Sequence, residues 1–238
     1  MALSEPLVST SRTGSSHGRE KPAVFSPPAG LRGPKELVVA LSALKRTSQW
    51  AEALSLLWAA GLKLNVICCS AAATACERVG RWQEALGLQS ELGRRGLQVD
   101  VIFCGSVLSA CEKAKQWGWA LALLSELSSG GVRGVAPNTV TCNAALSAFA
   151  QSGQWERALV LLESMTLETH RTPDVISFSA TLSACEKAGA WQVALQLFGQ
   201  LCVSALQLDL VALNSAVSAC AAGGEWRWAL HLLATTTL

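Results

Sequence analysis

Several residue types and motifs are missing from the chain, and each absence narrows the classes of protein to which it can belong. The 238 residues include no tyrosine and only three histidines. The nine cysteines form no C-x-x-C motif, so a zinc ribbon and a disulfide framework are both disfavoured. The longest near-apolar runs, Val66–Cys76 and Val101–Cys111, are 11 residues each. A membrane-spanning helix needs roughly 18 or more, so we expect no membrane partner.

Charge is also scarce, and it is evenly balanced. Charged residues make up 15% of the chain and apolar residues 50%, so the chain can bury a large core. Residues 1–33 hold four basic and two acidic residues, and residues 34–238 hold 15 of each sign. Nucleic-acid binding by such a neutral body requires local placement of charge and not a strongly basic surface.

One pattern repeats six times through residues 34–238. Tryptophans recur at spacings of 32 to 38 residues, at Trp50, Trp82, Trp117, Trp155, Trp191 and Trp226. Each is followed three and four residues later by Ala-Leu, and an alanine lies seven residues before each. A period of this length is typical of stacked helical hairpins, which bury their apolar stripes only against their neighbours. The sequence places the units at 34–65, 66–100, 101–138, 139–174, 175–209 and 210–238.

Each unit divides into two predicted helices. The second half reads W-x-x-A-L-x-L, which sets apolar residues along one helical stripe. The first half, for example Phe178–Lys187, is rich in small residues and predicts a shorter helix. Glycine lies between the halves in most units, and Asp or Asn closes most units, often after proline. The fold class predicted is therefore all-α, a solenoid of about six helix-turn-helix repeats.

Two segments of the array resemble the pentatricopeptide repeat in its P-type form. They read NTVTCNAALSAFAQSGQWERALVLLESM and DVISFSATLSACEKAGAWQVALQLFGQL. The resemblance covers 34–238 and is weakest in the first unit, where Pro34-Lys35-Glu36 replaces the usual opening. It implies a right-handed superhelix that binds single-stranded RNA, one base per repeat. It also implies a role in RNA processing, stability or translation in a mitochondrion or plastid.

In this family the fifth residue of a unit and its closing residue read the base edge. The resemblance puts these pairs at Ser70 with Asp100, Gly105 with Asn138, Asn143 with Asp174, and Ser179 with Asp209; Asn214 opens a further pair, and the first unit offers Val38 with Asn65. A small hydroxyl residue with Asp is similar to the family's guanine-reading pair, and Asn with Asp to its uracil-reading pair. The implied preference is G-x-U-G, read 5′ to 3′ from the N-terminal side, with no base defined by Gly105 or Val38.

Two further columns complete the implied site. The second residue of each unit is aliphatic and by resemblance clamps the base between neighbouring units: Ile67, Ile102, Val140, Ile176 and Val211. A basic column near the end of the first helix would contact phosphates: Arg46, Arg78, Lys113 and Lys187. Four such contacts in a neutral body predict moderate, salt-dependent binding.

Simpler interpretations stand beside these. One alternative is that the closing Asp and Asn residues only favour turns; another is that the basic column is a solvated helix end that the helix dipole favours. The tryptophans are expected in the core. Most cysteines occupy repeat columns and are expected to pack as small apolar residues; a metal site at Cys68, Cys69 and Cys76 is disfavoured because no histidine lies near.

No catalytic or cofactor motif stands out. The sequence contains neither G-x-G-x-x-G nor a P-loop pattern, and we expect no enzyme activity, cofactor, metal or small-molecule substrate. Residues 1–33 are expected to be disordered; a transit peptide is one interpretation, although Glu5 and Glu20 disfavour it. Two alternatives stay open: a protein-binding solenoid similar to tetratricopeptide repeats, and a truncated product without a stable fold of its own.

Overall fold

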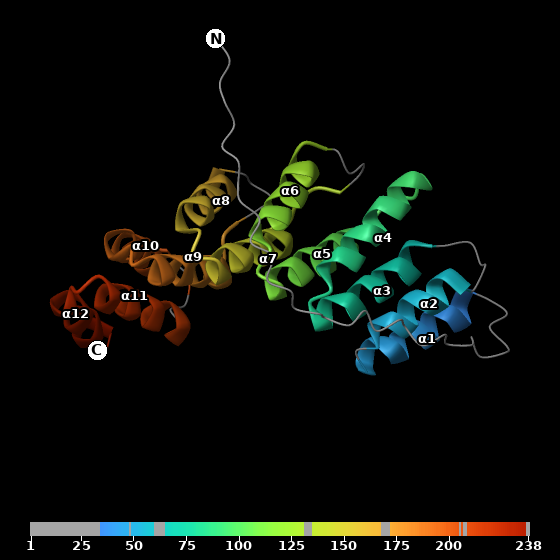
Figure 1. Cartoon of the computed structure of the whole chain (residues 1–238). Coiled ribbons are helices and arrows are strands. Elements are labelled where there is room, and N and C mark those ends of the chain that lie inside the picture. The colour runs from blue at the N-terminus through green and yellow to red at the C-terminus, as the bar shows by residue number, and fades with distance from the viewer. Residues whose placement is uncertain are drawn as a thin grey trace, which may run out of the picture.

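In the computed structural model, the part of the chain that is described consists of residues 34–47, 49–59, 65–130, 135–167, 172–204, 206 and 209–236. All regular structure in these ranges is α-helical, in six consecutive helix pairs that we call repeats 1 to 6 (Figure 1). The first helices are α1 (Pro34–Thr47), α3 (Val66–Val79), α5 (Val101–Lys113), α7 (Thr139–Gln151), α9 (Val175–Ala188) and α11 (Leu210–Ala222). The second helices are α2 (Trp50–Ala59), α4 (Trp82–Arg94), α6 (Trp117–Ser128), α8 (Trp155–Leu167), α10 (Trp191–Val203) and α12 (Trp226–Thr236).

The two helices of a repeat lie in different layers. Each first helix packs on the first helices of the neighbouring repeats, as α5 does on α3 and α7. Each second helix packs on its own first helix, and α2, α4, α6, α8 and α10 also pack on the first helix of the next repeat. Neighbouring second helices meet only through side chains where the described ranges show it, as between α4 and α6, where the Trp82 and Trp119 rings lie 5.9 Å apart. The first helices therefore form a continuous layer, along which the pairs follow one another from α1 to α12 (Figure 1). The predicted all-α repeat solenoid is confirmed.

The repeated alanines and leucines form the contacts within and between repeats. Ala75, Ala110, Ala148, Ala184 and Ala219 have no exposed surface, because the close approach of neighbouring helices leaves room only for a methyl group. Trp155 packs against both clusters of buried side chains and so joins the two halves of the array. Of the helices in the described ranges, none is both long enough and apolar enough to cross a lipid bilayer.

The tryptophans lie at the junctions between repeats and not deep in the core. Those of repeats 1 to 5 are half-buried, and Trp226 in repeat 6 is 61% exposed. The guanidinium of Arg81 in repeat 2 lies 4.1 Å from the Trp50 ring of repeat 1, and Arg157 in repeat 4 lies 4.1 Å from the Trp117 ring of repeat 3. Each of these tryptophans begins a second helix, and the rings of Trp50, Trp82 and Trp117 contact the repeat that follows. The expectation of a core column is corrected to a column of inter-repeat contacts.

The prediction that the first helices are the shorter ones is wrong. They have 13 or 14 residues, against 10 to 13 in the second helices. In repeat 5 the helix begins just after the capping Asp174 and ends at Gly189, whose φ of 67° is left-handed. The spacing of cap and glycine sets the helix length, and the small residues between them are what the crowded layer accepts.

Lys115 is the one described residue other than glycine with a left-handed backbone, at φ 56°, where most other repeats have glycine. A side chain in that conformation costs roughly 1 kcal/mol or slightly more. We expect Lys115→Gly to raise the free energy of unfolding by about 1 kcal/mol in urea denaturation. The matched change Gly153→Ala, at φ 66°, should lower it by about the same amount. Equal, unchanged midpoints for both variants would contradict this.

Candidate nucleic-acid interface

The closing Asp and Asn residues cap the first helix of the following repeat. The side chain of Asp100 accepts a hydrogen bond from the Phe103 backbone N–H at 2.7 Å, and Asp209 accepts one from the Ala212 N–H at 2.7 Å. Asn65, Asn138 and Asp174 cap their helices in the same way. The turn-favouring interpretation is thus right for these residues, because an N-cap satisfies one of the otherwise unpaired N–H groups of the first turn.

The same residues also contact the fifth residue of their own repeat. The Ser70 hydroxyl donates to Asp100 Oδ1 at 3.0 Å, and the Ser179 hydroxyl lies 3.2 and 3.3 Å from the two carboxylate oxygens of Asp209. Asn143 Nδ2 donates to Asp174 at 3.0 and 3.1 Å. Each closing residue caps the first helix of the next repeat. The three polar pairs therefore bridge neighbouring repeats at the N-terminal ends of their first helices, between α3 and α5, α7 and α9, and α9 and α11.

The fifth side chains are largely covered by the repeat that follows. Ser70, Asn143 and Ser179 are only 7 to 9% exposed, whereas their Asp partners are partly exposed. Asn214, the fifth residue of repeat 6, is exposed. A polar group covered in this way needs a partner, and the carboxylate of the next cap provides it. Each pair therefore presents a pre-formed polar edge in which the Asp is the more accessible member.

Two of the sequence-predicted pairs do not form such a bridge. Gly105 has no side chain to contact Asn138, whose Oδ1 accepts from the Thr141 N–H at 2.9 Å. Val38 is partly buried against the core cluster, and Asn65 Oδ1 accepts from the Cys68 N–H at 2.8 Å. Both departures agree with the expectation that these two positions define no base.

The second-place aliphatic residues form an exposed column beside the pairs. Their exposed fractions lie between 58 and 69%: Ile67, Ile102, Val140, Ile176 and Val211. Each lies in the first turn of a first helix, three residues before the fifth place. Five large aliphatic side chains that are mostly exposed contribute little to the core, so packing within the described ranges does not explain their recurrence.

The basic column lies at the opposite end of the first helices, about 12 Å along the axis from the fifth place. Arg78, Lys113 and Lys187 are exposed there, and the side chain of Arg46 lies outside the described residues. Lys113 Nζ lies 3.3 Å from Glu77 Oε1 of the preceding repeat, whereas Lys187 Nζ donates to the neutral Gln151 at 3.2 Å. The Lys113 charge is therefore partly compensated.

Two buried hydroxyl residues that complete helix caps were not predicted from the sequence. Ser177 and Thr141 are fully buried at the third place of α9 and α7, and each completes a capping box with the residue that closes the preceding repeat. Ser177 also contacts the fifth-place Asn143, at 2.6 Å. The sequence signal is an Asp or Asn followed three residues later by a hydroxyl residue, which is a variant of the capping box.

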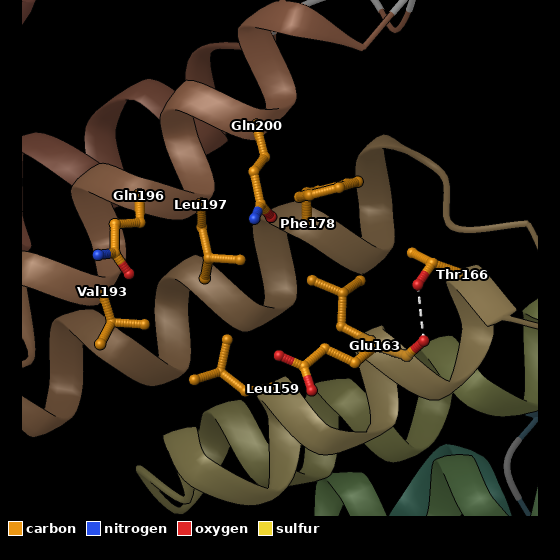
Figure 2. Close-up of a pocket in the computed structure, with 9 residues that line it drawn as sticks. Leu159, Glu163, Thr166, Phe178, Val193, Gln196, Leu197 and Gln200 are labelled. Atoms are coloured by element: carbon orange, nitrogen blue, oxygen red, sulfur yellow. Dashed lines mark hydrogen bonds between the residues drawn. The ribbon is translucent and has the colours of Figure 1, made fainter.

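Two hollows in the described part of the chain lie among the second helices. One of about 430 Å³ opens between α8 and α10, with Leu159 and Glu163 on one side and Leu197 and Gln200 on the other (Figure 2). A second, of about 380 Å³, lies against α6 and α8.

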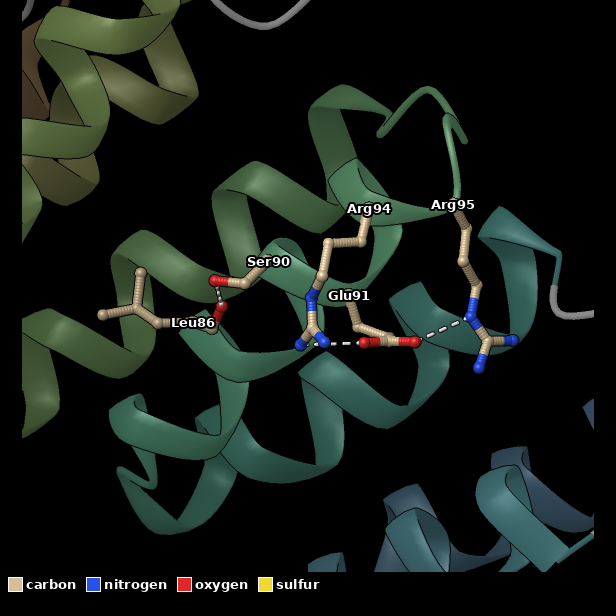
Figure 3. Close-up of polar contacts among 5 residues, drawn as sticks. All are labelled: Leu86, Ser90, Glu91, Arg94 and Arg95. Carbon is tan, nitrogen blue, oxygen red and sulfur yellow. Dashed lines mark hydrogen bonds and ion pairs between the residues drawn. The ribbon is translucent and has the colours of Figure 1, made fainter.

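At the end of α4, the Glu91 carboxylate forms ion pairs with the guanidinium groups of Arg94 and Arg95, at 2.9 and 2.8 Å (Figure 3). These arginine charges are therefore partly compensated.

The cysteines are mostly buried within the helical layers. Burial raises the pKa of the Cys76 thiol to about 12 and those of Cys104, Cys111 and Cys185 to about 11. Within the described ranges no three His, Cys, Asp or Glu side chains are grouped so that they could hold a metal ion. The packing interpretation of these columns is supported.

Alkylation tests this burial. A raised pKa leaves almost no thiolate below pH 9, and thiolate is the reactive form. We expect iodoacetamide at pH 8 to modify the exposed Cys202 first, with Cys76, Cys104 and Cys111 reacting only after denaturation. Mass spectrometry of peptides from native and urea-treated protein measures the order. Fast native labelling of Cys76 would contradict the packing.

The chain is similar to known proteins both in sequence and in structure. Residues 123–188 match the pentatricopeptide repeat domain. The chain is similar in structure to the maize pentatricopeptide repeat protein PPR10, at 23% identity and a TM-score of 0.63, over 84% of this chain and 29% of that one. It is similar to PPR10 in complex with an 18-nucleotide psaJ RNA element, at 26% identity and a TM-score of 0.67, over 84% of this chain and 28% of that one.

A further similarity is to the repeat domain of Arabidopsis thaliana protein-only RNase P 1 in complex with tRNA. The identity is 17% and the TM-score 0.56, over 70% of this chain and 87% of that one. No curated protein matches the chain significantly, and the chain spans less than a third of the PPR10 chains. These matches show a pentatricopeptide repeat domain at residues 123–188 and, with the helix pairs and their repeated columns, the fold of a pentatricopeptide repeat solenoid over the described ranges.

Proposed function

We propose that the chain binds single-stranded RNA along its first-helix layer, with repeats 2, 4 and 5 selecting G, U and G. The observation that carries this is the recurrence of a polar inter-repeat pair beside an exposed aliphatic side chain. In repeat 4 these are the Asn143–Asp174 pair and Val140. Each such site offers a polar edge to one base and an apolar contact to its face. The proposed role is binding and not catalysis.

The chemistry of each pair favours particular bases. An ionised Asp only accepts hydrogen bonds, so it suits guanine N1–H or uracil N3–H and disfavours adenine and cytosine, whose corresponding ring nitrogens are acceptors. The fifth residue then distinguishes guanine from uracil. The Asn143 amide extends further and can donate to a uracil oxygen, whereas Ser70 and Ser179 are shorter and leave room for a purine. Asn138 beside Gly105 leaves the second position unspecified.

Filter binding with a matched set of oligonucleotides tests the proposal. The set contains G-x-U-G, the four bases at x, single mismatches at the other three positions, and scrambled sequences of equal composition. We expect each mismatch to weaken binding by roughly tenfold, the usual cost of a lost base contact, and the base at x to have little effect. Equal, weak affinity for all sequences would overturn the proposal.

The ion pair between Glu77 and Lys113 predicts that removing the Glu77 charge changes the salt dependence of RNA binding. Glu77→Gln should release Lys113 for a phosphate, raise affinity at low salt, and steepen the slope of log K against log salt by about 0.7. Anisotropy titrations across a salt series measure both quantities. In a Lys113→Met background the same change should have no local effect. An equal shift in both backgrounds would show that only the overall charge matters.

We also propose an organellar role in RNA processing, stability or translation, which the family resemblance supports. Residues 1–33, for which a transit peptide is one interpretation, lie outside the described residues. Import and cleavage of a tagged full chain would test the compartment, and a purely cytosolic signal would count against it. Protein binding stays a prediction from the sequence; a pull-down that survives nuclease while RNA crosslinking fails would favour it.

A further inference from the structure

The buried hydroxyl of Ser177 forms a contact that the base-reading pair itself does not account for. Its Oγ lies 2.6 Å from Asn143 Oδ1, 2.9 Å from Asp174 Oδ1 and 3.2 Å from the Asp174 backbone N–H. Ser177 belongs to repeat 5, whereas Asn143 belongs to repeat 4. The third residue of the next repeat thus contacts the fifth residue of this repeat.

The surrounding hydrogen bonds decide which oxygen accepts the single hydroxyl proton of Ser177. The oxygen accepts the Asp174 N–H, and the proton can go to Asn143 Oδ1 or to Asp174 Oδ1. Asp174 Oδ1 already accepts from the Ser177 N–H at 2.9 Å and from the Asn143 amide at 3.0 Å. Asn143 Oδ1 is also the closer acceptor. The Ser177 hydroxyl therefore donates to the Asn143 carbonyl and holds it toward the buried Ser177 side chain. The Asn143 amide N–H groups then lie on the side of Asp174.

We propose that Ser177 is a positioning residue for base selection in repeat 4, because it fixes which end of the Asn143 amide the RNA base meets. The proposal rests on the RNA-binding function proposed above. Uracil needs a donor from this amide, and cytosine, with its exocyclic amino group, would be better served by the carbonyl. By holding the carbonyl inward, Ser177 favours uracil over cytosine.

The other repeats agree with this relation. Ser70 and Ser179 have no side-chain carbonyl to satisfy, and the third places that follow them are the apolar Phe103 and Ala212. Thr141 holds a hydroxyl at the same place, but the fifth residue of the preceding repeat is Gly105, which has no amide. A buried carbonyl without a donor is costly, so an Asn at the fifth place calls for a hydroxyl at the third place of the next repeat.

Base-resolved affinity of the full chain for G-x-U-G and G-x-C-G oligonucleotides tests the proposal. We expect Ser177→Ala to lower the uracil-to-cytosine preference at the third base by about two- to tenfold, the factor that one hydrogen bond contributes. Ser177→Thr should restore it. Thr141→Ala is the matched control: it also removes a capping-box hydroxyl but should leave base preference unchanged, although both alanine variants lower the melting temperature.

A gain-of-function pair guards against misfolding of the alanine variants. Ser179→Asn alone places an amide before Ala212, and Ser179→Asn with Ala212→Ser adds the missing hydroxyl. The uracil-to-cytosine preference at the fourth base should be about two- to tenfold larger in the double variant than in the single variant, the factor that one hydrogen bond contributes. An unchanged ratio in Ser177→Ala, or no gain from Ala212→Ser, overturns this inference alone. A wild-type chain without base preference overturns the proposed function instead.

Discussion

Replacing Asn143 with serine is expected to change the base preferred by repeat 4 from uracil to guanine. The Asp174 carboxylate is common to both kinds of pair and still accepts a ring N–H. The shorter hydroxyl removes the donor that reaches uracil and opens space for a purine. Since a mismatched base typically costs about 1–3 kcal/mol, the ratio of guanine to uracil affinity should rise by at least about tenfold.

Competition binding with G-x-U-G and G-x-G-G oligonucleotides measures this ratio for wild type and variant. Asp174→Asn is a useful companion, because Asn retains the helix cap but replaces one acceptor oxygen with a donor. It should weaken recognition of both bases while changing the unfolding midpoint little. If Asn143→Ser leaves the ratio unchanged, the fifth residue does not read the base.

The second large effect separates stability from binding on a single helix. Leu146 in α7 has no exposed surface, and Leu146→Ala should lower the free energy of unfolding by about 2–5 kcal/mol, the usual cost of a cavity in a packed core. Val140 on the same helix is 68% exposed. Val140→Ala should change stability by less than about 0.5 kcal/mol. It should weaken RNA binding by about 15-fold, because two methyl groups covered by a base contribute about 1.6 kcal/mol.

Thermal denaturation measures the stability of each variant, and RNA titration measures its affinity for RNA. A marked loss of stability in Val140→Ala would place this side chain in the fold and not in a binding surface. Unchanged RNA affinity in Val140→Ala would remove the aliphatic column from the proposed site. A small effect of Leu146→Ala would mean that the first-helix layer is more loosely packed than its burial indicates.

The fold was largely predictable because its signals are local and repeated. The period, the tryptophans and the glycine breaks each recur, so a single ambiguous unit does not change the conclusion. Errors arose where the outcome depends on neighbours. A tryptophan column reads as core from its apolar character alone, yet Trp226 is exposed because no described repeat follows it. Helix length likewise depends on the distance between caps and not on composition.

The candidate site was predictable as columns but not as contacts. The family resemblance assigned Ser70, Asn143 and Ser179 to the site, and the structure adds that each contacts the Asp that caps the next repeat. The Glu77–Lys113 pair and the Ser177–Asn143 contact join residues 36 and 34 positions apart. Such contacts depend on how two repeats stack, which no single repeat specifies.

Selection from a random RNA library tests most directly whether the inter-repeat pairs read bases. The full chain is incubated with random single-stranded RNA at moderate salt, and bound molecules are sequenced. The account predicts enrichment of G-N-U-G with no preference at the second base, and a shift to G-N-G-G when Asn143→Ser is used. Enrichment of an unrelated motif that Asn143→Ser leaves unaltered, or no enrichment at all, would contradict it.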